Sequence, residues 1–443
     1  MKRRMGQDRV ELHDRVNNKR CGYKIAFVSA FHGLGMGGAE VSSELIAAYL
    51  QRLFAYRVHI FTARWVEPRT GLHVIPGTWW IPTRALLFGH AAIDSFLSGA
   101  LVRGMRRVGK PDLIHAQEIY SLAAAVMAGH ELGVPVVATV RDPVPRVICR
   151  GDYPGWLHPL MTLVLLLRAR QWMRVLAKPA ELGQAWVISR PQLLLSLRDC
   201  AAVISVSDYI RHNLVSLGLE AQKVVTIYNI PDNWQNVNDD DVTCGIRLPE
   251  ENGLRVLAAG RLVEEKGFHV LVEALHILGE QVRSWRVIFA GEGSYRRRLE
   301  SMVEARGLAQ VVRFLGTIPH SEMGALYRWS DIVVCPSVFP EPLGRVALEG
   351  MSAGRPVVAS RAGGSPEIIV PKETGLLVPP GDAVALAEAL QSLAKNRAER
   401  EEMGQRAKMR AAAVFSPDVL ARQTAQLYQH VLQSWHAERS IVG

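Results

Sequence analysis

The chain has 443 residues, of which 49% are hydrophobic and 21% charged, a composition that excludes a disordered chain and is typical of a folded globular protein. This length exceeds one ordinary hydrophobic core and predicts two domains of roughly 200 residues each. The five cysteines form no CxxC pair and no metal-ligand spacing, so we expect no metal site, and reduced thiols in a cytoplasmic protein.

The net charge of +10 lies mostly in the first half of the chain. Residues 1–240 contain 28 Lys and Arg against 19 Asp and Glu, whereas residues 241–443 contain 24 against 23. This surplus favours an anionic partner, such as a membrane surface or a phosphate-bearing acceptor. A generally basic, soluble protein is an equally good interpretation.

The N-terminal domain is predicted to span residues 22–235. Before it, residues 1–21 are basic and polar without the apolar run of a signal peptide, and we expect them to form a disordered leader. Within the domain, short apolar runs alternate with helical patterns, which predicts βαβ units and a parallel sheet. The predicted strands are Lys24–Ala30, Tyr56–Thr62, Asp112–Ala116, Pro135–Thr139, Ala201–Ser205 and Val224–Tyr228.

The stretch Trp156–Pro179 is a candidate for membrane contact. Its apolar run Leu160–Leu167 is too short to cross a bilayer, but it is followed by the basic residues Arg168, Arg170 and Arg174. Tryptophan and basic residues beside an apolar stripe are typical of an interfacial helix. A helix packed on its own domain explains the pattern equally well.

A second domain is predicted over residues 253–415, after a linker at 236–252 that is rich in Asn and Asp. The alternation of strands and helices resumes there, and a final helical segment occupies residues 416–443. The sequence therefore predicts an α/β protein with two Rossmann-like, doubly wound domains, and ligands at the carboxyl ends of their strands. The predicted strands are Arg255–Ala259, Arg286–Ala290, Val311–Phe314, Ile332–Cys335 and Pro356–Ala359.

The strongest functional signal is the segment FPEPLGRVALEG, in which Glu341 and Glu349 flank the start of a predicted helix. A helix N-terminus offers free N–H groups and a partial positive charge to a pyrophosphate, and Gly344 allows close approach of the backbone. The two carboxylates can accept hydrogen bonds from sugar or ribose hydroxyls. On spacing alone, two surface glutamates on an amphipathic helix are the better explanation.

Loops that follow other predicted strands make ligand binding, and not two surface glutamates, the better explanation. Arg261 and Lys266 bracket a loop that opens a helix, where two cations can neutralise a diphosphate. Gly291 stands in a tight AGEG turn, and Ile318 stands in the turn LGTIP, whose backbone can hold a base. Because each loop follows a parallel strand, we expect all of them at one edge of the sheet.

In this order, the elements GR-x4-KG, AGxG, E-P-x-G-x4-E and GGxxE resemble glycosyltransferase family 4, over most of residues 250–380. The resemblance implies the GT-B fold, in which the two domains face a central cleft and a C-terminal helix often packs back on the first domain. It implies that Arg261 and Lys266 hold the donor phosphates, Glu341 contacts the transferred sugar and Glu349 binds the ribose. It also implies that Leu343 and Gly344 offer backbone N–H groups.

Arg345 departs from the family, since many members have an apolar residue there. It adds a phosphate contact or is simply a surface residue.

The resemblance is weaker in the first half. Gly37 and Gly38 match a GGxE loop that family members place near the diphosphate and the acceptor. Gln117 stands where members often have a histidine, and Arg141, before Asp142, replaces the histidine of T-x-H-D. We interpret these residues, with His115, as the vicinity of the acceptor or sugar. For His115 itself, a buried structural role is an equal alternative.

The resemblance implies a retaining, metal-independent enzyme without a cofactor, which moves a hexose from a UDP- or GDP-sugar to a glycan or lipid-linked acceptor in polysaccharide or cell-envelope biosynthesis. No DxD pair stands in a suitable loop, since Asp239–Asp241 lies in the linker. A sugar-nucleotide epimerase or a phosphorylase of similar fold is the alternative among enzymes. A non-catalytic, basic membrane-binding protein is the alternative from another class, and no motif predicts nucleic-acid binding.

Overall fold

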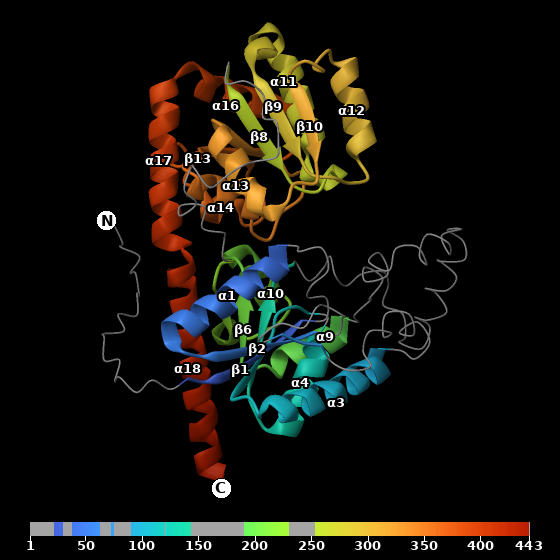
Figure 1. The fold of residues 1–443 in the computed structure, drawn as a ribbon, viewed down its shortest axis with the longest axis vertical. Coiled ribbons are helices and arrows are strands. Elements are labelled where there is room, and N and C mark those ends of the chain that lie inside the picture. Colours follow the sequence, from blue (N-terminus) through green and yellow to red (C-terminus); the bar gives the residue numbers. More distant parts are fainter. Residues whose placement is uncertain are drawn as a thin grey trace, which may run out of the picture.

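The computed structural model describes residues 22–29, 38–62, 72–74, 90–119, 121–142, 190–229 and 253–442. Two parallel sheets, each with helices packed around it, lie one above the other along the long axis of the molecule (Figure 1). The predicted α/β class and the two Rossmann-like domains are therefore confirmed. The predicted leader, the linker at 236–252, Gly37 and Trp156–Pro179 lie outside the described residues.

The first sheet has seven parallel strands in the order β3-β2-β1-β4-β5-β6-β7. Its central strands are short runs of apolar residues that are buried on both faces, as a parallel sheet between two helical layers requires. The strands are β1 (Lys24–Ser29), β2 (Arg57–Thr62), β3 (Leu72–Val74), β4 (Leu113–Ala116), β5 (Val136–Val140), β6 (Ala202–Ser205) and β7 (Val224–Thr226). The helices around them are α1 (Gly38–Phe54), α3 (His90–Val108), α4 (Leu122–Leu132), α9 (Arg190–Arg198), α10 (Asp208–Ser216) and the 3-10 turn η2 (Ala221–Lys223).

The second sheet has six parallel strands in the order β10-β9-β8-β11-β12-β13. They are β8 (Arg255–Ala259), β9 (Arg286–Ala290), β10 (Val312–Gly316), β11 (Ile332–Cys335), β12 (Val357–Ser360) and β13 (Gly375–Val378). The connecting helices are η5 (Glu264–Lys266), α11 (Phe268–Leu278), η6 (Gly279–Ser284), α12 (Arg296–Ala305), α13 (His320–Trp329), α14 (Arg345–Ser352), α15 (Ser365–Ile368) and α16 (Ala383–Lys395). All connections are crossovers between parallel strands, so every loop after a strand lies at the same edge of the sheet.

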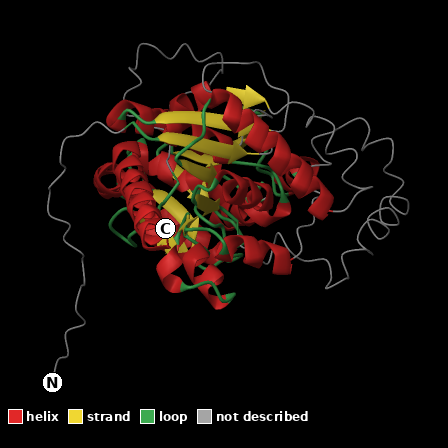
Figure 2. Cartoon of the chain, turned by 90° about the horizontal axis from the view of Figure 1, so that it is seen from below, coloured by secondary structure: helices red, strands yellow, loops and turns green. Residues whose placement is uncertain are grey.

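Two long helices at the C-terminal end, α17 (Arg397–Val414) and α18 (Pro417–Val442), run down one side of both domains (Figure 1). Figure 2 shows helices on both sides of the strand layers. The apolar face of α18 packs under the first sheet, where Leu420, Ala425 and Tyr428 share a buried cluster with Phe27 and Val137. The C-terminal segment thus belongs structurally to the N-terminal domain, although it follows the second domain in the sequence.

Every strand predicted from apolar runs is present, with ends that move by one or two residues. Two edge strands were not predicted, namely β3 and β13. β3 is only three residues long and β13 begins with a glycine, so neither gives an apolar run of the usual strand length.

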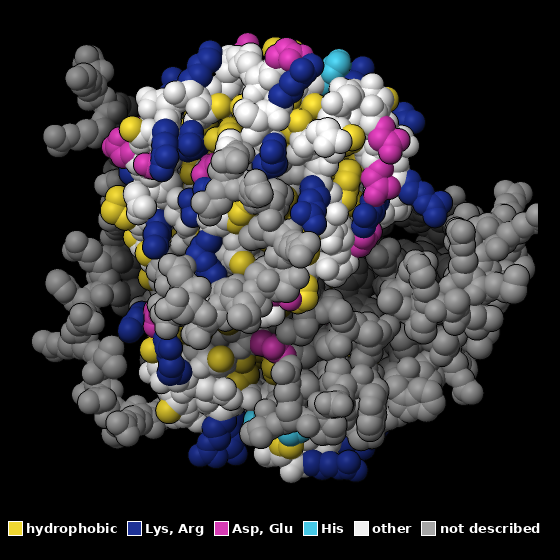
Figure 3. Space-filling view, turned by 45° about the horizontal axis from the view of Figure 1, so that its top comes forward, with side chains coloured by type: hydrophobic (Ala, Val, Ile, Leu, Met, Phe, Trp, Pro, Cys, Tyr) yellow, Lys and Arg dark blue, Asp and Glu magenta, His cyan; other side chains and the backbone are white. Residues whose placement is uncertain are grey.

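Among the described residues, no helix is both long and apolar enough to span a bilayer. On the part of the surface that Figure 3 leaves uncovered, lysine and arginine side chains are scattered among acidic and other residues and do not gather in one patch.

Candidate functional site

A cavity of about 340 Å³ opens at the carboxyl edge of the second sheet. Its floor is formed by the residues directly after three neighbouring strands: Gly260 follows β8, Gly291 follows β9 and Thr317 follows β10. Among the described residues of the N-terminal domain, Val41 of α1 is the one that lines it. The cavity has the size and position of a small-molecule site in a doubly wound domain.

Of the residues predicted to bind donor, four line this cavity: Arg261, Gly291, Ile318 and Glu349. Gly291 has a positive φ of 139°, and an added Cβ would lie 1.9 Å from the carbonyl oxygen of Gly260. A glycine is therefore needed there so that two neighbouring loops can meet under the cavity. Lys266, Glu341, Leu343 and Gly344 are not lining residues.

Glu349 is a buried carboxylate, 5% exposed, whose two oxygens have separate protein donors. Arg345, one turn earlier on α14, donates from Nε to Oε1 at 2.7 Å, and the Tyr327 hydroxyl donates to Oε2 at 2.6 Å. Burial, together with the charge of Glu349, raises the pKa of Tyr327 well above its usual range, so that hydroxyl remains a donor. Each carboxylate oxygen keeps a further lone pair for a ligand hydroxyl.

The structure thus gives Arg345 a definite role. Its side chain is only 17% exposed, it lines the cavity, and its guanidinium lies 3.5 Å from the ring of His320. The interpretation as a simple surface residue is wrong. Charge-assisted bonds of this kind hold a carboxylate in one orientation more firmly than neutral bonds do.

Glu341 forms an ion pair with Lys266, with 2.9 Å between Nζ and Oε2. Ser337 donates a hydrogen bond to the other oxygen of Glu341. Both members of the ion pair are largely shielded from solvent, at 25% and 17% exposure, which makes their attraction less screened than that of a surface pair. The loop after β8 and the loop before α14 are therefore tied to each other by charge.

Arg261 is exposed, whereas the start of α14 is largely buried but has no side-chain cap. Arg261 is 67% exposed and lies 3.9 Å from Glu265, a geometry in which the pair contributes little to stability. Gly344 is the N-cap of α14, and no side chain caps that helix end. An added Cβ at Gly344 would meet only atoms at 3.6 Å or beyond, so protein packing alone does not require a glycine there. No side chain thus bonds to the backbone N–H groups of the first turn of α14, the arrangement of helix starts that bind anions.

Three of the residues predicted in the N-terminal domain, His115, Gln117 and Arg141, form a hydrogen-bonded network. His115, 2% exposed, accepts at Nδ1 from the Gln117 amide at 2.9 Å and from the Tyr428 hydroxyl of α18, and its Nε2–H donates to Thr139 at 2.7 Å. This tautomer is assigned from the hydrogen bonds. Burial, and then the charge of Arg141, lowers the pKa of His115 to about 3, so the ring is neutral.

The same network includes Arg141, which donates to the backbone oxygen of Gln117 and, at 3.0 Å, to its side-chain oxygen. Together these residues border a cavity of only about 30 Å³, room for roughly one water. Asp142 is exposed after β5, and Gly38 is the first residue of α1. Of the two alternatives for His115, the structure favours the buried structural role.

The lining residues that were not predicted include three on α13, and only one of these three had a signal in the sequence. His320 directly follows the turn LGTIP and should have been included with it. Tyr327 and Met323 lie on α13, 22 or more residues from Glu349. Nothing local to their sequence indicates that α13 turns this face toward the cavity.

Two family models match the chain. The model for "Glycosyltransferase Family 4" matches residues 36–232, and that for "Glycosyl transferases group 1" matches residues 246–410. The chain belongs to glycosyltransferase family 4.

Two proteins of similar sequence agree with this membership. The glycogen synthase of Mycobacterium tuberculosis is 27% identical to this family 4 chain over 343 residues, which are 77% of the chain and 74% of that protein. The alpha-D-kanosaminyltransferase of Streptomyces kanamyceticus is 31% identical over 242 residues, 53% of the chain and 62% of that protein.

Solved structures share the fold of this glycosyltransferase. HepE from Anabaena, solved with UDP and glucose, superposes with a TM-score of 0.67 at 21% identity and covers 92% of the chain and 100% of its own. Sucrose-phosphate synthase from Thermosynechococcus elongatus superposes with a TM-score of 0.69 at 22% identity, over 93% and 100%. The predicted GT-B fold is confirmed.

Proposed function

We propose that this family 4 enzyme is a retaining glycosyltransferase that moves a hexose from a UDP- or GDP-sugar to a glycan or lipid-linked acceptor in polysaccharide or cell-envelope biosynthesis. The observation that carries the proposal is the pairing of Lys266 with Glu341 just before the uncapped helix α14, and of Arg345 with Glu349 within it. Paired cations and carboxylates around a free helix N-terminus suit a ligand that has both a diphosphate and hydroxyl groups.

The leaving group of such a transfer is a nucleoside diphosphate. Lys266, Arg261 and the first turn of α14 stabilise the negative charge that develops on it. When Lys266 turns toward the diphosphate, Glu341 becomes free to accept hydrogen bonds from the transferred sugar. Glu349, held in orientation by Arg345 and Tyr327, accepts from the ribose hydroxyls.

Retention of configuration requires the acceptor to approach from the face that the diphosphate leaves. Positioning and charge stabilisation by the residues above are sufficient for such a transfer, without a protein nucleophile. Arg261 and Lys266 also perform the charge neutralisation for which other transferases use a metal. We therefore propose a metal-independent reaction, and activity should persist in excess EDTA; a loss that added Mn²⁺ or Mg²⁺ restores would contradict this part.

Support for a UDP-sugar comes from HepE, which was solved with UDP and glucose, and the GDP-sugars remain part of the proposal. The test is a panel of UDP- and GDP-hexoses incubated with purified full-length protein, with and without candidate acceptors. Slow release of UDP or GDP from one donor is the expected result. Conversion of the donor into an epimeric sugar nucleotide, with no diphosphate released, would favour the epimerase instead.

The acceptor is proposed to be lipid-linked or close to a membrane because the basic surplus lies in residues 1–240. Co-sedimentation with anionic vesicles tests this at low and high salt, since charge attraction fades with ionic strength whereas buried apolar contact does not. Triple substitution of Arg168, Arg170 and Arg174 by Gln should weaken binding. Protein that stays in the supernatant at low salt would leave a soluble glycan as the better acceptor.

A further inference from the structure

One contact between the two domains is made by Glu367, the last residue of the GGxxE element, to which no role has been given so far. Glu367, on the short helix α15 of the C-terminal domain, accepts hydrogen bonds from the backbone N–H groups of Asp208 at 2.7 Å and Tyr209 at 2.8 Å. These are the first two residues of α10 in the N-terminal domain. Ser207 accepts from Ile210 at 3.2 Å, so the first turn of α10 is capped partly by its own domain and partly by the other one.

A third bond reaches Glu367 from the Tyr228 hydroxyl, which also belongs to the N-terminal domain. Burial raises the pKa of Tyr228 to about 12, so this hydroxyl stays protonated and donates. On the opposite side, Arg410 of α17 donates to the backbone oxygens of Glu367 at 2.8 Å and Ile368 at 2.9 Å. Glu367 is thus held by its own domain through the backbone and by the other domain through the carboxylate.

The turn that presents Glu367 is packed against the loop that contains Glu341. Gly364 donates its N–H to the backbone oxygen of Glu341 at 2.8 Å. Gly363 has a positive φ of 58°, and an added Cβ would lie 1.9 Å from that same oxygen; at Gly364 it would lie 2.4 Å from the oxygen of Pro342. No side chain fits between the two loops, so a displacement of one is transmitted to the other.

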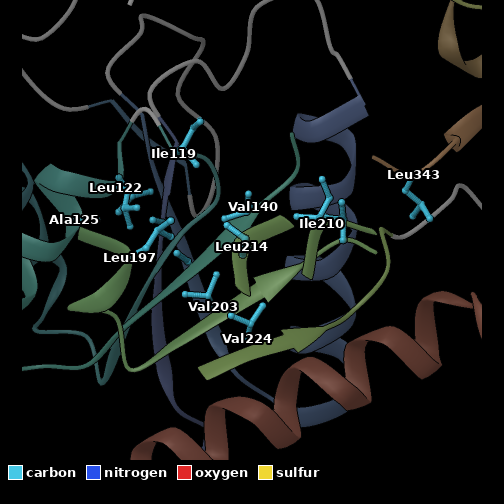
Figure 4. Close-up of a cluster of buried hydrophobic side chains, with 14 of the residues drawn as sticks. Ile119, Leu122, Ala125, Val140, Leu197, Val203, Ile210, Leu214, Val224 and Leu343 are labelled. Atoms are coloured by element: carbon cyan, nitrogen blue, oxygen red, sulfur yellow. The ribbon is translucent and has the colours of Figure 1, made fainter. Parts of the chain in front are cut away.

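Apolar packing follows the same route across the domains. Leu343, on the loop next to Glu341, is buried in one cluster with Ile210 and Leu214 of α10 (Figure 4). The loop of Glu341 and the helix that Glu367 caps therefore belong to one continuous buried cluster that spans both domains.

We propose that Glu367 is a positioning residue, which fixes the loop of Glu341 to the N-terminal domain and so aligns the donor sugar with the acceptor side. This rests on the proposed transferase function. It predicts that nucleotide binding and turnover respond differently to the loss of Glu367. Nucleotide binding depends almost entirely on the C-terminal domain and should survive this loss, whereas turnover should not. A misplacement of about 1 Å can reduce turnover by up to a hundredfold.

The test compares Glu367→Ala and the isosteric Glu367→Gln with Asp382→Ala in the full-length protein. Asp382 caps α16 through Ala385 at 2.9 Å and is a matched control, because that cap lies within one domain. With the donor that the wild type turns over, kcat should fall by about tenfold or more in both Glu367 variants and by less than twofold in the control. The Kd of UDP or GDP, measured by calorimetry, should change by less than twofold in all three.

A variant in the N-terminal domain tests the same contact from its other side. Tyr228→Phe removes only the hydroxyl bond to Glu367, and its effect on kcat should be smaller and should not add to that of Glu367→Gln. Full additivity, or a Glu367 effect no larger than that of Asp382→Ala, would overturn the proposal.

Hydrogen exchange separates this outcome from failure of the proposed function, since it requires no substrate. In Glu367→Ala, exchange should quicken both at residues 208–211 and in the loop 339–345. Faster exchange at 208–211 alone would show that the cap stabilises α10 without reaching the donor loop, and would contradict the inference even if the wild type turned over no donor.

Discussion

The two sheets both carry polar side chains at the carboxyl ends of their strands, but the surroundings of these side chains differ. In the C-terminal domain, Glu349 and Arg345 border a cavity of about 340 Å³, whereas in the N-terminal domain His115 and Arg141 border one of about 30 Å³. The first has room for a nucleotide-sized ligand and the second for about one water. A position after a strand therefore brings a residue to the functional edge without deciding whether it binds a ligand.

The hydrogen bonds explain the difference. In the N-terminal domain the acceptors and donors of His115 and Gln117 are used within the protein, including one bond to Tyr428 on α18. In the C-terminal domain Lys266 and Glu341 pair with each other, and under the proposed function a diphosphate and a sugar replace that pairing. Substitutions in the first set should change mainly stability, and substitutions in the second mainly catalysis.

The largest expected effect is the pH dependence of stability that His115 causes. Its pKa is about 3 in the folded protein and about 6.5 in the unfolded chain, so the unfolded state binds more protons between these values. The free energy of unfolding should therefore decrease as the pH falls from 6.5 to 3, by about 5 kcal/mol over the full window.

Denaturant unfolding of wild type and His115→Asn at several pH values measures this contribution. The variant should be less stable at pH 7, because it loses the bonds to Tyr428 and Thr139, and the difference between the two proteins should shrink as the pH falls. A difference that stays constant from pH 7 to pH 4 would mean that His115 is not buried as a neutral ring.

The next largest effect concerns catalysis. Lys266→Ala and Arg261→Ala should each reduce kcat by about a hundredfold, equivalent to about 3 kcal/mol in the barrier, because each removes a cation from the leaving diphosphate. The stability of Arg261→Ala should be nearly unchanged, whereas Lys266→Ala should be somewhat less stable because it leaves the largely buried Glu341 without its ion-pair partner. Arg283→Ala is the control, since Arg283 is 76% exposed and pairs only with Glu280 in the described structure.

Near-normal turnover in both soluble variants would contradict the assignment of the site. A large effect for Lys266 with a small one for Arg261 would be informative in another way. It would show that the partly buried ion pair with Glu341, and not the exposed Arg261, presents the cation to the diphosphate.

The positions of the site residues in the C-terminal domain were largely predictable from the sequence, because each depends on a short, continuous segment of the chain. Strand, glycine turn and helix start follow one another within a few residues, so Gly291 and Glu349 could be placed at one edge from their loops alone. The expected position of Glu341 before the helix and Glu349 inside it matches α14, which begins at Arg345.

What could not be predicted are contacts between residues far apart in the chain. His115 bonds to Tyr428, 313 residues away, and Glu367 caps a helix that begins 159 residues earlier. Tyr327 reaches Glu349 only because α13 packs beside α14. Such pairs depend on how helices cross a finished sheet, and residue type and spacing do not encode that geometry in a single sequence.

A smaller effect, opposite in sign to that of His115, should come from Asp94 in α3 of the N-terminal domain. Its carboxyl is 8% exposed and accepts a bond from Gln192 of α9 at 2.9 Å. Burial raises the pKa of Asp94 to about 6, and the bond from Gln192 opposes this. The folded state therefore binds more protons than the unfolded chain between pH 3.8 and 6, and the contribution of Asp94 to stability decreases as the pH rises through that window.

Asp94→Asn keeps the size and one acceptor oxygen but cannot ionise, so it should be more stable than the wild type at pH 8, by about 2 to 3 kcal/mol, and gain nothing at pH 4. The difference between the two proteins isolates Asp94, because the contribution of His115 is present in both and cancels. Asp199→Asn, an exposed carboxylate just after α9, should be neutral at both pH values. If Asp94→Asn is no more stable than wild type at pH 8, the carboxylate is stabilised as an ion, and the N-terminal domain accommodates buried charge as readily as the donor site does. That result would remove the contrast between a closed network around a neutral His115 and an open charged site. The expected result would extend the contrast from His115 to a second buried group, 21 residues earlier in the chain.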